Sequence, residues 1–544
     1  VLPSPAMAQG IFTEVERDLL TAQGIELASG GKQKIFEEQF LIYRGLTRPS
    51  KGLWLTYAAN DAEGRELSPS SLIERLQRLD EGLQIEPMPA FDLEETAPTA
   101  VFHLLGGEMR KATAEAPLSP LWQDIYGFFD ENSQWQKHLS LLKQGIGKTA
   151  KPERLSPKTA KALYGKNIFS SVSRLERFAG CPFSFFAEYG LKAEERRLYQ
   201  LNTPDLGSLF HEVLELFSNK LEQDSLPWTS LTKEETTARI HAAVEDAAPR
   251  LGNRILLDSA ANQYLIRRLK RISTRAAWTL VQHLQQGDFV PAGYEVGFGA
   301  HEALPPIVIR LQDGGSLILN GKIDRVDLLD ANGTRYVKII DYKSGNKTFH
   351  FQDIYYGLQL QLLVYLDAYL KYYKKTGASF KPGGVFYFRI TDPTLALDEE
   401  LSAEAIEKIL YEKMRMSGLL LQEDVLIHGL DHSLAESRSS AIVPVGYTKK
   451  GDPTAASNLA TEEQYAAILD FVATRTQEIG DAMKAGIITP APYRDGQRTP
   501  CSYCSYRSLC RHSYGEAPRW RKLKKIDKAD FWESITPKQP PETE

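Results

Sequence analysis

The hydrophobic pattern changes in the middle of the chain from helical spacing to a two-residue repeat, and this change requires a fold that combines helices with a sheet. Turn signals at Asp313-Gly-Gly and Asn332-Gly divide the alternating stretch. The predicted strands are Val290–Phe298, Ile307–Leu311, Ser316–Leu329 and Thr334–Tyr342. Helices are expected at about 257–285 and at Tyr355–Tyr372, with a further strand at Gly384–Arg389. This order predicts an α/β fold with a mixed sheet.

The length of 544 residues exceeds the size at which a single hydrophobic core stops growing, so two or three domains are expected. The hydrophobic fraction of 42% is ordinary, and no apolar stretch approaches the roughly 18 residues of a membrane span. The start at Val1 has no initiator Met and no basic segment followed by an apolar one, so a secretory signal is not predicted. We therefore expect a piece of a longer, cytoplasmic protein.

The net charge of −5 does not by itself indicate nucleic-acid binding, although a local basic groove can bind phosphates within an acidic protein. Basic clusters occur at Arg267–Arg271 and at Arg519–Lys525. Each of them fits a solvated helix face or tail as well as it fits a path for phosphates.

The four cysteines are sparse, and their spacing matters more than their number. Cys501, Cys504 and Cys510 form a C-x2-C-x5-C cluster, and Cys181 stands alone far upstream, before a proline. Thiolates at C-x2-C spacing are usually metal ligands rather than disulfide partners. Four thiolates suit either Zn2+ or a [4Fe–4S] cluster, and the spacing alone does not choose between them.

Acidic residues end or interrupt two neighbouring predicted strands. Asp324 lies in Gly-Lys-Ile-Asp, whereas Asp341 and Lys343 are two apart and project from one face of their strand. Two carboxylates can hold a divalent cation such as Mg2+ while the lysine orients or activates a water, which is what phosphodiester hydrolysis needs. The alternative is a surface Asp–Lys pair, which contributes under about 1 kcal/mol. D-x-K alone favours that alternative, and the strand carrying Asp324 reverses the preference.

A histidine lies on the amphipathic helical pattern 206–217, at His211. The zinc-protease motif H-E-x-x-H is excluded because its second histidine position holds Glu215. A lone helical histidine is more often a satisfied core residue, so only the matched sequence around His211 makes it a candidate ligand.

These motifs together resemble the RecB-type branch of the PD-(D/E)xK nuclease superfamily. The resemblance is carried by Gly321–Asp327, by Asp341–Gly345 and by Gln361–Tyr365 on the next helix. Gly207–Glu215 matches the upstream helix that supplies a histidine ligand in that branch. The resemblance implies a restriction-endonuclease-like core with a mixed sheet.

The same resemblance implies roles for individual residues. The Mg2+ ligands would be His211, Asp324, Asp341 and the backbone carbonyl of Tyr342. Lys343 would serve the attacking water, while Gln361 and Tyr365 would lie near the DNA strand or brace the site. Glu295 recurs in this branch as an acid before the strand, and we place it outside the ligand set.

The cysteines resemble the iron–sulphur staple of the AddB family, the second subunits of bacterial AddAB helicase–nucleases. The resemblance favours [4Fe–4S] over Zn2+ at Cys181, Cys501, Cys504 and Cys510. A link between residues 181 and 510 closes a loop that spans the domain, which removes chain entropy from the unfolded state and favours a structural role. The family also implies an AddA-like partner subunit.

Near the start, Tyr43–Tyr57 resembles the last motif of UvrD-like helicases, a helix before a strand at 51–57. Pro49 replaces the alanine of that motif, which weakens an ATP-contacting role for Arg48. No G-x-x-x-x-G-K-[ST] loop occurs in this chain, and the partial match Gly30–Gln33 lacks both the leading glycine and the hydroxyl. A complete ATPase motor is therefore not expected in these residues.

We predict the end of a helicase-like α/β domain at 1–60, a helical connector at 61–165, a nuclease domain at 166–525 and a flexible tail at 526–544. Residues 392–460, which are charged and weakly periodic, are interpreted as an insertion in the nuclease domain. The expected function is degradation of single-stranded DNA, the 5′-ended strand by family resemblance, during ATP-dependent processing of double-strand breaks for recombination. The alternatives are a free-standing iron–sulphur exonuclease and a metal-stapled DNA-binding scaffold without activity.

Overall fold

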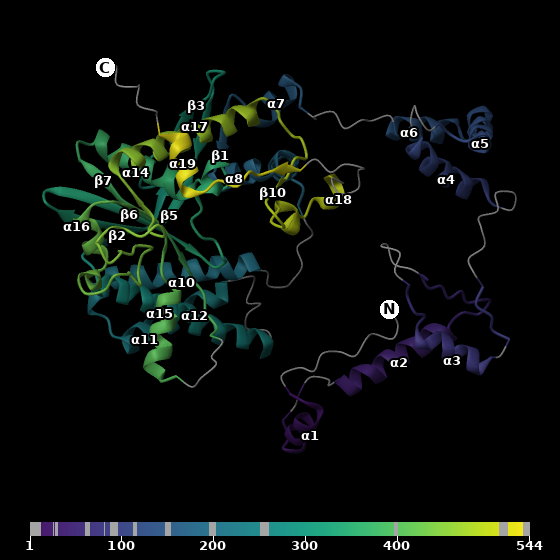
Figure 1. Ribbon diagram of the computed structural model, residues 1–544, viewed down its shortest axis with the longest axis horizontal. Coiled ribbons are helices and arrows are strands. Elements are labelled where there is room, and N and C mark those ends of the chain that lie inside the picture. The colour runs from purple at the N-terminus through teal and green to yellow at the C-terminus, as the bar shows by residue number, and fades with distance from the viewer. Residues whose placement is uncertain are drawn as a thin grey trace. The chain divides into compact units, whose positions relative to one another are not determined.

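The computed structural model divides the chain into two compact units, residues 1–149 and 150–544 (Figure 1). The structure describes residues 12–25, 27, 31–59, 66–80, 82–86, 96–112, 117–146, 154–194, 203–250, 260–395, 401–510 and 520–536. Within these ranges no helix is long and apolar enough to cross a membrane.

The regular elements in the described part of unit 1 are helices. Its helices are α1 (Glu14–Ala22), α2 (Gly31–Thr47), α3 (Ser71–Leu79), α4 (Pro98–Lys111), α5 (Pro120–Glu131) and α6 (Gln136–Ile146). Helices α4 to α6 share a small core of Val101, Leu105, Phe129 and Leu139. Proline at the first turn of α4 and of α5 fits their starts, because the amide N–H that proline lacks has no partner there.

The strand predicted at residues 51–57 is wrong. This segment forms no regular element, and Trp54 is 92% exposed. A strand needs a neighbour to accept its hydrogen bonds, and no described residue pairs with this segment in a ladder.

The core of unit 2 is a six-stranded sheet in the order β2-β5-β6-β7-β8-β9. Its strands are β2 (Val290–Phe298), β5 (Gly321–Ala331), β6 (Thr334–Lys343), β7 (Phe380–Arg389), β8 (Ser417–Leu421) and β9 (Leu459–Ala460). Strands β2, β5 and β6 form an antiparallel meander, and β6 pairs with β7 in parallel. The predicted mixed sheet is confirmed.

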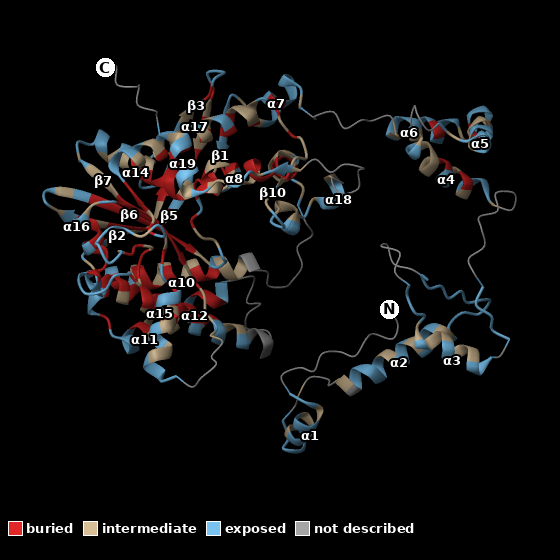
Figure 2. Ribbon diagram, in the orientation of Figure 1, coloured by how far each residue is buried: buried red, intermediate tan, exposed pale blue. Residues whose placement is uncertain are grey.

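Helices cover both faces of this sheet, which explains why the seven residues from Tyr336 to Tyr342 in β6 are all buried (Figures 1 and 2). One layer holds α10 (Thr203–Gln223), α11 (Lys233–Ala247) and α12 (Ala260–Gln285). The other layer holds α8 (Val172–Gly180), α14 (Gln361–Lys375), α17 (Glu462–Lys484) and α19 (Lys528–Ile535).

Shorter elements connect these layers. They are α7 (Pro157–Tyr164), β1 (Asn167–Ser170), α9 (Pro182–Phe185), the π-helical turn Phe186–Gly190, the 3-10 turn Trp228–Ser230, α13 (Phe351–Tyr355), α15 (Ala403–Lys413), α16 (Asp424–Leu430), the 3-10 turn His432–Ala435, β10 (Tyr493–Arg494), the 3-10 turn Pro500–Tyr503, α18 (Arg507–Cys510) and β11 (Arg521–Lys522).

The strand predicted at Ser316–Leu329 is two strands in two sheets. β4 (Ser316–Leu319) lies between β1 and β3 (Ile307–Arg310) in a small sheet, and β5 starts in the main sheet at Gly321. A Cβ at Gly321 would collide with the hydroxyl of Tyr365. The alternating pattern continues across the change of sheet, so periodicity alone could not detect it.

The helix predicted at Tyr355–Tyr372 is also divided. α13 ends at Tyr355, Gly357 takes a left-handed conformation with φ of +73°, and α14 starts at Gln361. Glycine is suited to this turn because it has no Cβ to clash.

Two segments that the sequence analysis set apart from the core belong to it. Residues 392–460 contribute β8 and β9, and Leu419 and Leu420 are fully buried, so this interpreted insertion extends the sheet. The flexible tail predicted from residue 526 is wrong for α19, whose Phe531 and Trp532 are buried in the main core. Residues 537–544 lie outside the described residues.

Candidate active site

Asp324 and Asp341 meet across the central strands. Arg325 of β5 lies opposite Ile340 of β6, so the next positions along each strand, 324 and 341, are neighbours. Oδ2 of Asp324 accepts a hydrogen bond of 2.6 Å from the backbone N–H of Tyr342. Asp324 is thereby fixed against the strand that carries the D-x-K motif.

Both oxygens of Asp341 have a polar neighbour. Nζ of Lys343 lies 2.5 Å from Oδ2, and Nε2 of Gln361 donates a hydrogen bond of 2.6 Å to Oδ1. The predicted proximity of Asp341 and Lys343 is therefore observed, and Gln361 reaches the same carboxylate from the first residue of α14.

His211 comes from α10, whose apolar residues pack into the main core and leave the imidazole at the margin of the sheet. Its Nδ1 lies 3.4 Å from Oδ2 of Asp324, and its ring contacts the ring of Tyr342 edge-on at 6.1 Å between centroids. Gly207 allows this approach, because a Cβ there would lie 2.9 Å from Oγ of Ser344. The glycine and the histidine of the motif thus have separate physical roles.

Glu295 lies closer to the site than the sequence analysis expected. It sits opposite Asp324, between the pairs Tyr294–Arg325 and Val296–Ile323, with a left-handed φ of +46°. One potential ligand atom from each of His211, Glu295 and Asp324 lies within 4.8 Å of the other two. Asp341 does not complete a group of this kind with His211 and Asp324 at that distance.

The carboxyl groups repel one another in a buried setting. Burial and then the charge of Asp324 raise the pKa of Asp341 to about 6, although Lys343 opposes the shift. Burial, followed by the charges of Asp324 and Glu215, raises the pKa of Glu295 to about 7. A cation placed among these groups would relieve the repulsion.

The two basic groups of the site hold their protons more firmly than usual. Burial lowers the pKa of Lys343, but the carboxylate of Asp341 outweighs it and the net shift is upward. Burial lowers the pKa of His211, but the hydrogen bond with Asp324 and the charges of Asp324 and Asp341 together outweigh it, so the net shift is upward. Lys343 is therefore an ammonium at neutral pH and can donate hydrogen bonds but cannot accept a proton.

Tyr365 lies behind the carboxylates. Its side chain is buried, its ring packs on Phe298 with 5.5 Å between centroids, and its hydroxyl abuts Gly321. This position suits a brace for the start of β5.

Glu176 of α8 is a neighbour that the sequence analysis missed. Its Oε1 accepts hydrogen bonds from the backbone N–H groups of Leu360 and Gln361, at 2.8 and 3.1 Å, and its Oε2 lies 3.2 Å from Nζ of Lys347. Glu176 thus caps α14 where Gln361 starts. No local sequence signal indicates this contact, because the partners are far apart along the chain.

The four cysteines gather at the end of α8. Cys181 follows α8 and is buried, Cys501 lies in the 3-10 turn Pro500–Tyr503, Cys504 follows that turn, and Cys510 ends α18. Burial raises the pKa of Cys181, and the nearby sulfurs of Cys501 and Cys504 add to the shift. The pKa of Cys501 is raised by burial and by Cys504 and Cys510. No three of these four sulfurs lie within 4.8 Å of one another.

The sequence profile of the PD-(D/E)XK nuclease superfamily matches residues 170–511. The chain belongs to the PD-(D/E)XK nuclease superfamily. The profile contains every candidate residue described above, and it confirms the nuclease-type core predicted from the motifs. The PD-(D/E)XK unit is preceded by residues 96–145, which match a second profile, the ATP-dependent helicase/deoxyribonuclease AddB fifth domain.

The chain is similar to proteins that are each named as a subunit of an ATP-dependent helicase/deoxyribonuclease. It is 38% identical to the protein of Alkaliphilus oremlandii over 98% of this chain and 47% of that protein. It is 39% identical to the protein of Alkaliphilus metalliredigens over 94% of this chain and 45% of that protein. The chain spans about half the length of the curated relatives it matches. The resemblance to the AddB family is confirmed.

Proposed function

We propose that this chain carries the nuclease activity of an AddB-like subunit, the Mg2+-dependent hydrolysis of phosphodiester bonds in single-stranded DNA. The observation that carries the proposal is the convergence of His211, Glu295 and Asp324 beside the Asp341–Lys343 pair. The superfamily profile over the same residues supports it.

The donor set fits a divalent cation that accepts oxygen and imidazole ligands. The proposed ligands are His211, Asp324, Asp341 and the backbone carbonyl of Tyr342, and Glu295 lies near enough to join them. A cation bound there would polarise the phosphoryl group and lower the pKa of a bound water.

The side chains supply the remaining functions. As an ammonium, Lys343 would orient the attacking water or donate to the phosphoryl oxygens where negative charge develops. Asp341 holds Lys343 at 2.5 Å, and Gln361 fixes the other oxygen of the same carboxylate. Tyr365, which packs against Gly321, would keep the start of β5 in place.

The proposal extends to the assembly. The relatives are named as one subunit of a helicase/deoxyribonuclease, which supports an AddA-like partner that unwinds DNA ends and supplies the strand. We propose that the 5′-ended strand is degraded during recombinational repair of double-strand breaks, in the cytoplasm, and that residues 1–60 end a helicase-like domain.

We also propose a [4Fe–4S] cluster on Cys181, Cys501, Cys504 and Cys510. Zn–S bonds of about 2.3 Å would bring four thiolates to within roughly 3.8 Å of one another. No three of these sulfurs are that close in the structure, and the choice of the cluster rests on the resemblance of the cysteine pattern to the AddB staple. Such a cluster would join α8 to the distant segment around α18, a structural role.

The cluster is tested by purifying the Cys504→Ser variant without oxygen, with Ser502→Ala as a control in the same turn. The parent and the control should be brown, contain iron and bind DNA ends. Cys504→Ser should lose the colour, and its folding and DNA-end binding should weaken. A colourless parent that contains zinc and is fully stable would refute the cluster.

The nuclease function is tested by cleavage of a single-stranded oligonucleotide with and without Mg2+, comparing the parent with Asp341→Ala. Asp330→Ala is the matched control, because Asp330 is an exposed carboxylate on β5 that pairs with Arg335. Cleavage should require Mg2+, survive in the control and vanish in Asp341→Ala while DNA binding remains. If neither the parent nor the variant cleaves although both bind DNA, the non-catalytic scaffold is favoured instead.

A further inference from the structure

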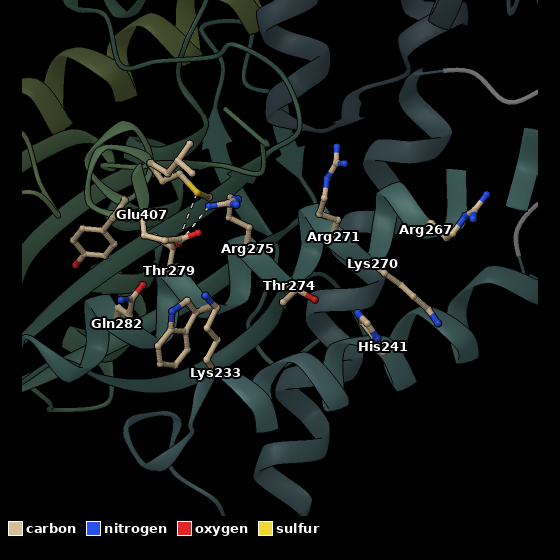
Figure 3. A pocket seen from close by; sticks show the side chains of 14 residues that line it. Lys233, His241, Arg267, Lys270, Arg271, Thr274, Arg275, Thr279, Gln282 and Glu407 are labelled. Atoms are coloured by element: carbon tan, nitrogen blue, oxygen red, sulfur yellow. Dashed lines mark hydrogen bonds and ion pairs between the residues drawn. The ribbon is translucent and has the colours of Figure 1, made fainter. Parts of the chain in front are cut away.

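A cavity lies in unit 2 between α11, α12 and α15 (Figure 3). Its volume is about 390 Å3, which falls within the range of pockets that hold small ligands. None of its lining residues belongs to the candidate active site. Part of its wall comes from the basic cluster at Arg267–Arg271, whose role the sequence analysis did not decide.

The cavity is strongly basic. Five Lys or Arg side chains line it, against one carboxylate, Glu407. The five are Lys233, Arg267, Lys270, Arg271 and Arg275. Asp392 pairs with Arg271 and Arg275 at 2.8 and 3.2 Å, Glu407 lies 3.6 Å from Arg275, and Glu245 lies 2.5 Å from Lys270. Lys233 and Arg267 have no carboxylate partner among the described residues, so positive charge is left in excess.

Two polar groups in the wall, His241 and Thr274, bear on what the cavity can bind. Burial lowers the pKa of His241, and the ammonium of Lys270 beside it lowers it further (Figure 3). The hydroxyl of Thr274 is buried in the wall without a hydrogen-bond partner among the described residues. An anion with several acceptor oxygens would offset the positive charge that lowers the pKa of His241.

The other end of the cavity is aromatic and apolar. Trp278 and Tyr411 line it together with Leu410 and Met414. Arg271 and Trp278 are seven positions apart on α12, or about 10 Å along the helix axis. Arg267, Lys270 and Arg271 therefore lie at one end of the wall, whereas the flat rings lie at the other end together with Lys233 (Figure 3). Cations beside aromatic rings are the combination with which proteins bind single-stranded nucleic acid.

We propose that this cavity binds a nucleotide unit, with its phosphate toward Arg267 and Arg271 and its base against Trp278. The unit would come either from a single strand of DNA or from a free nucleotide, since both present the same phosphate and base. Binding itself does not require hydrolysis at Asp341, and a role in guiding the substrate strand rests on the proposed function.

The proposal is tested by reversing the charge of one cavity residue and measuring the binding of a labelled oligothymidylate by fluorescence anisotropy. All variants are full chains that also carry Asp341→Ala, which prevents cleavage. Arg267→Glu should weaken binding about tenfold. Arg268→Glu is the matched control, because Arg268 is an exposed neighbour on α12 outside the cavity, and it should change binding less than about twofold. Equal effects of the two variants would overturn the proposal.

A photo-crosslink locates the base and does not depend on the variants. An oligonucleotide that carries 5-iodouracil should crosslink to Trp278 or Tyr411, and Trp278→Leu should reduce the yield at the cavity. Crosslinks confined to other residues would overturn the proposal. If thymidine monophosphate prevents the crosslink at concentrations similar to those at which an unlabelled oligonucleotide prevents it, the ligand is a free nucleotide. If only the oligonucleotide prevents the crosslink, the ligand is the DNA strand. A parent that crosslinks at the cavity but cleaves no DNA would contradict the proposed function while leaving this inference intact.

Discussion

Nδ1 of His211 lies 3.4 Å from Oδ2 of Asp324, although the two residues belong to different layers of the fold. The first residue sits on α10 and the second on the central strand β5. The contact joins the helical layer to the strands that carry Asp341 and Lys343. It is therefore the link by which packing of α10 sets the proposed metal site.

Replacement of this imidazole should weaken cation binding more than folding. We predict that His211→Ala raises the Mg2+ concentration needed for half-maximal cleavage by at least about tenfold. His301→Ala, an exposed histidine in the loop after β2, should leave it unchanged. Titration of cleavage rates with Mg2+ measures this difference, and an unchanged requirement in His211→Ala would remove the residue from the ligand set.

Glu176 offers a test of positioning rather than binding. Glu176→Ala should slow cleavage at saturating Mg2+ and destabilise the unit by about 1 kcal/mol, because α14 loses its cap and Gln361 its anchor. Glu176→Gln should restore part of the rate, since an amide oxygen accepts the same N–H groups. The Mg2+ requirement should stay unchanged in both variants. A rate that stays low in Glu176→Gln would point to the charge of Glu176 and not to its cap.

The sequence indicated the strand-borne part of the site because its logic is local. Side chains two positions apart on a strand lie on the same face of the sheet, so the spacing alone could place Asp341 beside Lys343. His211 could not be found in this way, and only its match to a known motif identified it. Its approach to Asp324 depends on how α10 packs on the sheet.

The features that the sequence analysis did not predict depend on backbone conformation or on contacts between distant residues. The resemblance named Glu295 but placed it outside the ligand set, and its own left-handed backbone in β2 brings it beside His211 and Asp324. Glu176 was missed, because it reaches the site by capping a helix that is distant in the sequence. The change of sheet before Gly321 gave no signal, because apolar and polar residues alternate in the same way in β4 and in β5. The buried residues Phe531 and Trp532 lie near a polar, proline-rich end of the chain, and only the long-range packing reveals them.

A buried ion network supports the catalytic strands from behind. Arg325 donates two hydrogen bonds to Asp327, at 2.6 and 3.0 Å, and Lys338 lies 2.9 Å from the same carboxylate. Asp327→Ala would leave two buried cations without their partner, so we predict a loss of about 3–5 kcal/mol of unfolding free energy. Asp330→Ala, which breaks an exposed Arg pair on the same strand, should change the unfolding midpoint little. Thermal unfolding of both variants checks the contrast, and similar midpoints would contradict it.

We predict that the buried side chain of His283 makes the free energy of unfolding decrease in acid. Burial, and then the charges of Lys338 and Arg325, lowers its pKa to about 3. Since the unfolded state binds the proton near pH 6.5, stability is complete above that pH and falls as the pH drops towards 3, by about 1.4 kcal/mol per pH unit. His283→Phe, which fits beside the rings of Phe388 and Tyr411, should lose less stability between pH 7 and pH 5 than the parent. Equal losses in thermal unfolding at these two pH values would show that other groups cause the sensitivity.

The most direct test of the proposed site is the anomalous diffraction of Mn2+ in crystals of the parent chain grown with Mn2+ in place of Mg2+. We predict a peak within about 2.5 Å of ligand atoms from His211, Asp324 and Asp341 together. A site that stays empty at saturating Mn2+, or ions bound only by other residues, would contradict the claim that these side chains share one cation.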